Sequence, residues 1–168
     1  EELKATDKTQ IAVTLVNLSA STILKEKGIN PEGFAGFSLG EYAALCDAGV
    51  ISMDNIFSLV KARGELMEKA SRSLDSESGN PGMAAVIGLG YDAIDSLISD
   101  GTLKGVYLAN YNSPEQIVIS GTHEGLTAAE GLLKDAGAKR VIRLKVSGPF
   151  HCPLLNQAGE GLAGVLEK

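Results

Sequence analysis

The pattern of hydrophobic and polar positions in the first part of the chain is typical of helices. Between residues 9 and 27, the positions expected on one helical face recur at three- and four-residue steps: Ile11, Leu15, Leu18, Thr22 and Ile23. We therefore predict a helix that buries this face and ends at Gly28. Two further helices are predicted over 40–48 and 52–71. Only the short apolar segment 34–37 could form a strand here.

A different pattern follows the polar, serine-rich segment 71–82. Short apolar runs at 83–89, 106–112, 116–121 and 139–147 predict strands, and helical spacing over 92–100 and 123–137 predicts two helices. The order strand, helix, strand, strand, helix, strand is the ferredoxin-like βαββαβ arrangement. We therefore predict an α/β protein in which a ferredoxin-like small subdomain, 81–147, is inserted into a large subdomain. Residues 1–80 and 148–168 would form parts of the large subdomain.

Residues 36–40 read G-F-S-L-G, the pattern of a nucleophile elbow between a short apolar segment and a helix. A serine held in a strained turn needs small neighbours, and Gly36 and Gly40 meet that need. The turn would present the hydroxyl of Ser38 at a helix N-terminus, where the backbone N–H of Leu39 can stabilise an oxyanion. Ser38 is the candidate nucleophile. A chance turn remains the alternative, because glycine accounts for 20 of the 168 residues.

A serine nucleophile needs a general base, and the chain has only two histidines. His123 follows Thr122 at the start of a predicted helix, where a solvated first-turn residue in a helix capped by Thr122 is the simpler interpretation. His151 lies in the sequence S-G-P-F-H-C-P, at the point where the chain leaves the predicted small subdomain. His151 is therefore the candidate base, and a surface loop histidine is the alternative.

Arg63 lies on the apolar-striped helix predicted over 52–71, on the same face as Val60 and Met67. If the acyl group carried a free carboxylate, a guanidinium could hold it through two parallel hydrogen bonds. The pattern leaves two possibilities open: an arginine that extends from the edge of the core to solvent, or one directed into a cavity.

Composition narrows the classes of protein that fit the chain. It is 44% hydrophobic and 21% charged, and its net charge of −6 with 5% aromatic residues argues against nucleic-acid binding. No apolar run is long enough to cross a bilayer, and the acidic N-terminus does not resemble a signal peptide, so we expect a cytoplasmic protein. Cys46 and Cys152 fall in no metal-ligand spacing, so we expect reduced thiols and no metal.

Four motifs resemble, in order and at similar spacing, the malonyl-CoA:acyl carrier protein transacylase family and the acyltransferase domains of polyketide synthases. They are GFSLGEYAAL, VKARGELM, ANYNSPEQIVISG and VSGPFHCPLL. The likeness covers nearly the whole chain. It implies an α/β-hydrolase-like large subdomain, here partial, with the ferredoxin-like insert.

The resemblance implies a ping-pong acyl transfer in fatty acid or polyketide synthesis, with no cofactor beyond the substrates. Ser38, activated by His151, would take a malonyl group from malonyl-CoA and pass it to the phosphopantetheine thiol of an acyl carrier protein. Arg63, in the family's R-G motif, would bind the malonyl carboxylate and so select malonyl over acetyl groups. Phe150 resembles the bulky residue of malonyl-selective members, which leaves little room for an α-methyl group.

The chain also departs from the family pattern. Phe37, a candidate substrate-binding residue, occupies the position directly before the nucleophile, where many members have histidine; any help from that side chain is absent, but activity need not be lost. The family's N-terminal strand and G-Q-G loop have no counterpart before Glu1, and the family's C-terminal part, which orients the histidine, has none either. We therefore expect weakened catalysis, since one lost oxyanion donor costs about 100- to 1000-fold in rate.

Two other functions fit parts of the pattern. A serine esterase or thioesterase would use the same elbow with water as acceptor, although no acidic partner for the histidine can be assigned. A catalytically incomplete scaffold that binds a carrier is the second alternative. The strip K-R-V-I-R-L-K carries four positive charges, and Arg143 and Lys145 on one strand face could dock an acidic carrier.

Overall fold

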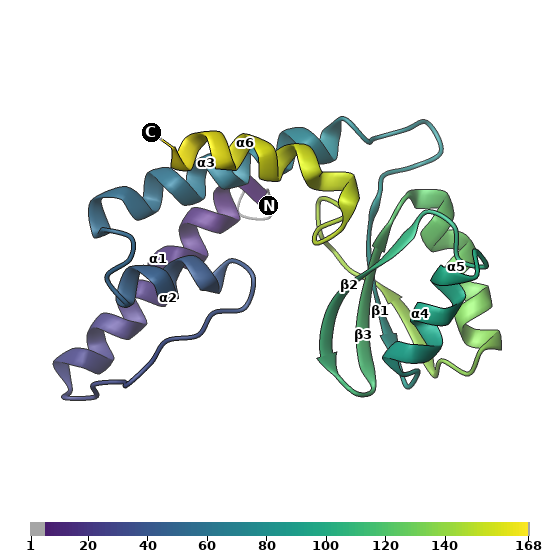
Figure 1. Cartoon of the computed structure of the whole chain (residues 1–168), viewed down its shortest axis with the longest axis horizontal. Coiled ribbons are helices and arrows are strands. Elements are labelled where there is room, and N and C mark those ends of the chain that lie inside the picture. The colour runs from purple at the N-terminus through teal and green to yellow at the C-terminus, as the bar shows by residue number, and fades with distance from the viewer. Residues whose placement is uncertain (1–5, 168) are drawn as a thin grey trace. The chain divides into compact units, whose positions relative to one another are not determined.

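The structure is a computed structural model that describes residues 6–167 (Figure 1). The chain forms two compact units. The first contains the chain up to Glu68 together with the segment from Gly161 onward, and the second is Lys69–Glu160. The sequence predicted a small subdomain over 81–147, whereas the second unit is longer at both ends. The two divisions rest on different criteria, so the predicted subdomain limits stay a prediction.

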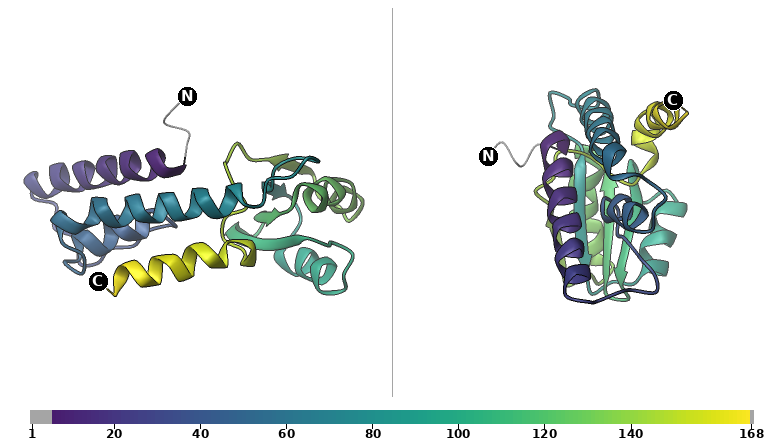
Figure 2. Two further views of the ribbon diagram at one scale, coloured as in Figure 1. Left: turned by 90° about the horizontal axis from the view of Figure 1, so that it is seen from above. Right: turned by 90° about the vertical axis from the view of Figure 1, so that its left-hand side faces the viewer.

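Helices make up the regular structure of the first unit. They are α1 (Thr6–Glu26), α2 (Gly40–Asp47), the greater part of α3 (Met53–Arg72) and the end of α6 (Asn156–Leu166). Their shared core consists of buried residues from the first three helices: Leu18, Ala43, Ile56 and Val60. Figure 2 shows α1 and α3 side by side. This close packing has a clear cause, because a Cβ added to Gly64 of α3 would lie 2.8 Å from the Cα of Asp7.

The buried face of α1 overlaps the predicted one only in part, since Leu18 is buried and Ile11 packs against the core as expected. The buried residues of the helix are Thr6, Gln10, Thr14 and Leu18, whereas the side chains of Leu15 and Ile23 are 54% and 52% exposed. The prediction chose the most apolar face, but α2 and α3 pack against a neighbouring face that carries polar side chains. The buried face of α1 is therefore available for polar interactions.

The segment 34–37 before α2 is irregular, so the tentative strand there is wrong. Among residues 6–167, the strands form a single sheet, and that sheet belongs to the second unit. A short strand needs a neighbour to pair with its backbone, and segment 34–37 has none in the described part of its unit.

The second unit contains the predicted ferredoxin-like fold. Its elements follow the order β1 (Gly82–Ile87), α4 (Tyr91–Ser99), β2 (Val106–Ser113), β3 (Gln116–Gly121), α5 (His123–Asp135) and β4 (Arg140–Arg143). The strands lie in the order β2-β3-β1-β4, and every pairing is antiparallel. The α/β prediction is therefore confirmed. The last strand is shorter than predicted and ends at Arg143.

The two faces of this sheet have different coverings. Ala84, Val86, Ile117 and Ile119 share a core with residues of α4 and α5. Figure 1 shows these two helices on one face of the sheet. The neighbours of these four residues along β1 and β3, including the fully buried Ser120, point to the other face. The segment before α6 contacts this second face, because Ser120 donates a hydrogen bond to the Phe150 carbonyl. A 3-10 turn, Pro153–Leu155, then leads into α6.

Candidate active site

Ser38 has the strained backbone expected of an elbow nucleophile. Its φ angle is 52°, in the left-handed region that non-glycine residues rarely adopt. The turn is closed by two backbone hydrogen bonds, from Gly40 N to Phe37 O at 2.9 Å and from Glu41 N to Ser38 O at 3.1 Å. These bonds lead directly into α2, so Ser38 lies at the N-terminus of a helix, as the motif predicts.

The two glycines of the motif have different steric roles. A Cβ added to Gly36 would overlap the backbone of Gly40 and Glu41, so only glycine fits at that position. A Cβ added to Gly40 would meet nothing within 4 Å. The prediction that both positions need a residue without a Cβ is therefore correct for Gly36 and wrong for Gly40.

Leu39 and Phe37 flank the serine in different environments. The side chain of Leu39 packs against the helical core, and its backbone N–H is not paired with a carbonyl of the described chain. This donor is therefore available to an oxyanion. Phe37 is 68% exposed and contributes, with Val13 and Phe34, to a hollow of about 450 Å³ between α1 and the elbow.

Arg63 is held by two side chains from other helices. Its Nη1 donates to the Oε1 of Gln10 at 2.6 Å, and its guanidinium carbon lies 5.2 Å from the centroid of the Tyr42 ring. Gln10 is 4% exposed, while Arg63 and Tyr42 are half-buried. The guanidinium is therefore fixed at the edge of the core rather than extended freely into solvent.

His151 also adopts a left-handed backbone conformation, with φ at 57°, and its side chain is exposed. Hydrogen bonds on either side fix the turn: Ser120 donates to the carbonyl of Phe150, and the Cys152 Sγ donates to the carbonyl of Pro149 at 3.0 Å. Burial raises the pKa of the Cys152 thiol. This neighbour is therefore kept as a thiol and is a poor nucleophile.

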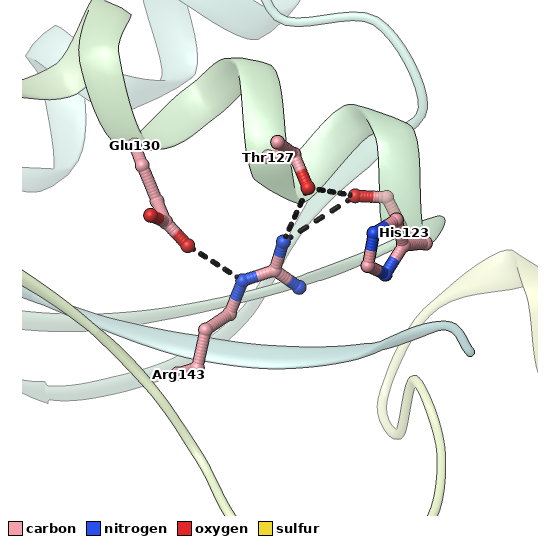
Figure 3. Close-up of polar contacts among 4 residues, drawn as sticks. All are labelled: His123, Thr127, Glu130 and Arg143. Atoms are coloured by element: carbon pink, nitrogen blue, oxygen red, sulfur yellow. Dashed lines mark hydrogen bonds and ion pairs between the residues drawn. The ribbon is translucent and has the colours of Figure 1, made fainter. Parts of the chain in front are cut away.

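His123 is the first residue of α5, as predicted, but its side chain is half-buried rather than solvated. The Oγ1 of Thr122 caps the helix by accepting a hydrogen bond from Gly125 N at 3.0 Å. Its backbone carbonyl accepts hydrogen bonds from Arg143 and Thr127 (Figure 3).

The same cluster corrects the predicted docking strip. Arg143 points toward α5, where its Nε donates to Glu130 at 2.8 Å and its Nη2 donates to Thr127 at 3.0 Å (Figure 3). Arg143 therefore joins β4 to α5 and does not share a solvated face with the exposed Lys145. The sequence could not reveal this pairing, because Glu130 comes from a different element.

The candidate site residues are divided between the two units. Phe37, Ser38, Leu39 and Arg63 belong to the first unit, and Phe150 and His151 belong to the second. Within the first unit, the structure adds Gln10 and Tyr42 as partners of Arg63. The signal for Gln10 was a polar residue at four-residue spacing from Thr14 and Leu18. The pairing of Ser38 with His151 remains a prediction.

Residues 6–167 contain neither a metal-binding cluster nor a membrane-spanning helix. No three side chains of the metal-binding types are grouped closely enough there to hold a metal ion. None of the helices combines the length and the apolar character needed to span a membrane.

Comparison with known proteins identifies the family of the chain. The acyl transferase domain family matches residues 1–168. The chain belongs to this family. The chain is 43% identical over 169 residues to the malonyl CoA-acyl carrier protein transacylase of Bacillus subtilis, and the match covers 99% of the chain and 52% of that relative. The Escherichia coli K12 protein of the same name is 39% identical, with coverage of 100% and 53%.

Solved structures give the same result. The crystal structure of MCAT from Streptococcus pneumoniae has a TM-score of 0.88 and 39% identity, and the match covers 99% of this chain and 53% of that one. A malonyl-transacylase in complex with a type II PKS acyl-carrier protein has a TM-score of 0.89 and 40% identity, with coverage of 99% and 53%. The chain thus spans about half the length of these relatives.

Proposed function

We propose that this chain transfers a malonyl group from malonyl-CoA to the phosphopantetheine thiol of an acyl carrier protein. The observation that carries this proposal is the left-handed backbone of Ser38 at the N-terminus of α2, within a G-x-S-x-G motif. A serine presented in this way is suited to attack an acyl carbonyl. The names of the relatives support the choice of malonyl group and carrier protein.

In the proposed first step, the Oγ of Ser38 attacks the thioester carbonyl of malonyl-CoA and its proton passes to His151. The backbone N–H of Leu39 donates to the oxyanion of the tetrahedral intermediate, and the N-terminus of α2 favours the same charge. The C–S bond then breaks. Coenzyme A leaves as a thiol with the proton from His151, and Ser38 carries a malonyl ester.

The second step reverses these roles with a different thiol. The phosphopantetheine thiol of the carrier gives its proton to His151 and attacks the malonyl ester. The bond to Ser38 breaks, and the serine hydroxyl recovers the proton. The two thioesters exchange one acyl group without oxidation or reduction, so the proposed reaction needs no cofactor besides its substrates.

Selectivity in this proposal comes from Arg63 and Phe150. A guanidinium that binds the free carboxylate of malonyl would be left unpaired by an acetyl group, which disfavours the smaller substrate. The ring of Phe150, directly before the base, would limit space for an α-methyl substituent. That effect is worth about 1–3 kcal/mol, the usual scale for one methyl group in a pocket.

The proposal places the reaction in the cytoplasm, in the supply of malonyl groups for fatty acid or polyketide synthesis. Serine hydrolysis is the competing chemistry at the same elbow. The two differ in the fate of the acyl-serine, which a transferase keeps until a thiol arrives and a hydrolase discharges to water.

Intact-protein mass spectrometry after mixing the chain with malonyl-CoA tests the proposal. We expect a malonyl adduct on the wild-type chain, no adduct on Ser38→Ala, and discharge when a phosphopantetheinylated carrier is added. Discharge in buffer alone at the same rate would instead indicate a hydrolase. A folded chain that acquires no adduct would contradict the proposal.

A further inference from the structure

Arg63 is oriented by a side chain from a different helix. Its Nη1 donates to the amide oxygen of Gln10 at 2.6 Å, across the contact between α3 and α1. We propose that Gln10 is a positioning residue that presets Arg63 for a substrate carboxylate. The proposal rests on the function proposed above, in which Arg63 binds the malonyl carboxylate.

The chemistry of Gln10 suits this role because its amide is neutral. An amide oxygen can orient a guanidinium without cancelling its positive charge, whereas a carboxylate at the same place would compete with the substrate. Gln10 is 4% exposed, and its Nε2 donates to the Sδ of Met67 at 3.4 Å. Both ends of the amide therefore have a partner, which fixes its direction.

The remaining surroundings of Arg63 leave part of the guanidinium open to a ligand. Tyr42 lies against one face, and Gln10 occupies one N–H of Nη1. In the part of the chain that the structure describes, no other acceptor contacts Arg63. An arginine has five N–H donors, so an adjacent pair remains for the two oxygens of a carboxylate.

The backbone next to Arg63 is also constrained. Gly64 is so close to α1 that an added Cβ would lie 2.8 Å from the Cα of Asp7, which leaves no space between the two helices. Gln10 is therefore presented to Arg63 from a helix that cannot move closer. An ordered guanidinium loses less conformational entropy when the substrate binds, which favours affinity.

The test compares malonyl and acetyl loading of Ser38, as kcat/KM, in Gln10→Leu and Gln10→Glu. We expect malonyl loading to fall about tenfold in Gln10→Leu, since one hydrogen bond to a charged group is lost, with acetyl loading unchanged. Gln10→Glu should reduce malonyl loading further, because a second carboxylate neutralises Arg63. Equal losses for both substrates, or wild-type malonyl loading in Gln10→Glu, would overturn the proposal.

Thr14→Val is the matched control. Thr14 is fully buried one turn further along the same helix face, and its Oγ1 has no hydrogen-bond partner in the described structure. This nearly isosteric change alters the same helix contact without touching Arg63, so the ratio of malonyl to acetyl loading should stay at the wild-type value.

Nuclear magnetic resonance of the Arg63 side chain separates this proposal from the proposed function. Relaxation of its Nε–Hε group requires no acylation. We expect an ordered group in the wild-type chain and in Thr14→Val, and a mobile one in Gln10→Leu. Equal order in wild type and Gln10→Leu would overturn the positioning role, even if malonyl loading occurs. If no malonyl loads but this difference is seen, the proposed function fails and the positioning role stands.

Discussion

The hydroxyl of Ser120 donates a hydrogen bond to the carbonyl of Phe150, and so ties β3 to the residue directly before His151. Ser120 is fully buried, and removing its hydroxyl leaves that carbonyl without its donor. We expect Ser120→Ala to lower the free energy of unfolding by about 1–3 kcal/mol, measured by urea denaturation. Ser96→Ala is the control, since its hydrogen bond to Asp92 is exposed. Equal stability changes in the two variants would contradict the prediction.

The elbow glycines should respond differently to alanine. Gly36→Ala places a Cβ against the backbone of Gly40 and Glu41, so the turn must distort and malonyl loading of Ser38 should be lost. In Gly40→Ala the added Cβ meets open space, and the φ angle of this residue is not in the left-handed region. Malonyl loading of Ser38 in this variant should therefore proceed at nearly the wild-type rate. Mass spectrometry of the acyl-serine measures both. Loss of loading in Gly40→Ala would show that the open space is needed by the substrate.

The strained backbone of Ser38 should affect the free energy of unfolding. At φ 52°, glycine is tolerated better than alanine, by about 1–2 kcal/mol. Thermal or urea unfolding should therefore find Ser38→Gly more stable than Ser38→Ala, although neither variant can be acylated. The same order is expected for His151→Gly and His151→Ala, because φ is 57° there. A more stable alanine variant at either position would mean that the left-handed conformation is not retained.

Substitutions of Arg143 and Lys145 should have different effects, because Arg143 is paired with Glu130 and Lys145 is exposed. Arg143→Gln removes the ion pair with Glu130, which is partly exposed, so a loss of about 0.2–1 kcal/mol in unfolding free energy is expected. Lys145→Glu should leave stability unchanged. If the exposed lysine helps to dock an acidic carrier, Lys145→Glu should raise the KM for the carrier without slowing acylation by malonyl-CoA. An unchanged KM would exclude Lys145 from docking.

The Lys25–Asp47 ion pair, with Nζ and Oδ1 2.6 Å apart, should make stability depend on pH. Burial tends to raise the pKa of Asp47, but hydrogen bonds from Lys25 and Ser21 and the charge of Lys25 outweigh it and lower the pKa. A lowered pKa stabilises the fold above the unfolded value, about 3.9, and this contribution disappears as the pH falls through the folded pKa.

Lys25→Met should therefore cost about 0.2–1 kcal/mol at pH 7 and less below pH 4. Urea denaturation across this range measures the difference. Lys61→Met is the control, because its pair with Glu65 is longer, 3.8 Å, and both side chains are well exposed. A cost for Lys25→Met that does not change with pH would indicate lost packing instead of lost charge.

Several features could be predicted because they depend on neighbours in the sequence. Alternating and helical apolar spacing predicted the βαββαβ order, and Thr122 was identified as the cap of α5. The G-x-S-x-G pattern predicted the turn at Ser38, whose φ is 52°. Each of these depends on interactions within one element or between consecutive ones, so the local sequence is sufficient.

The failures concern contacts between distant parts of the chain. Hydrophobic spacing predicted only part of the buried face of α1: Leu18 is buried as expected, but close packing at Gly64 also brings the polar Gln10 inside. Charge alone assigned Arg143 to solvent, although Glu130 pairs with it. The steric freedom at Gly40 was also missed, because it follows from how the turn meets α2.

The sequence by itself determined the family, the order of the elements and the residue types available for acyl transfer, because motifs and periodicity are properties of short stretches. Only the tertiary structure decided which polar groups meet. Gln10 and Arg63 are 53 positions apart, yet the packing of α1 on α3 places their side chains in hydrogen-bond contact. Such partners are chosen by the three-dimensional packing of helices, which a local pattern does not contain.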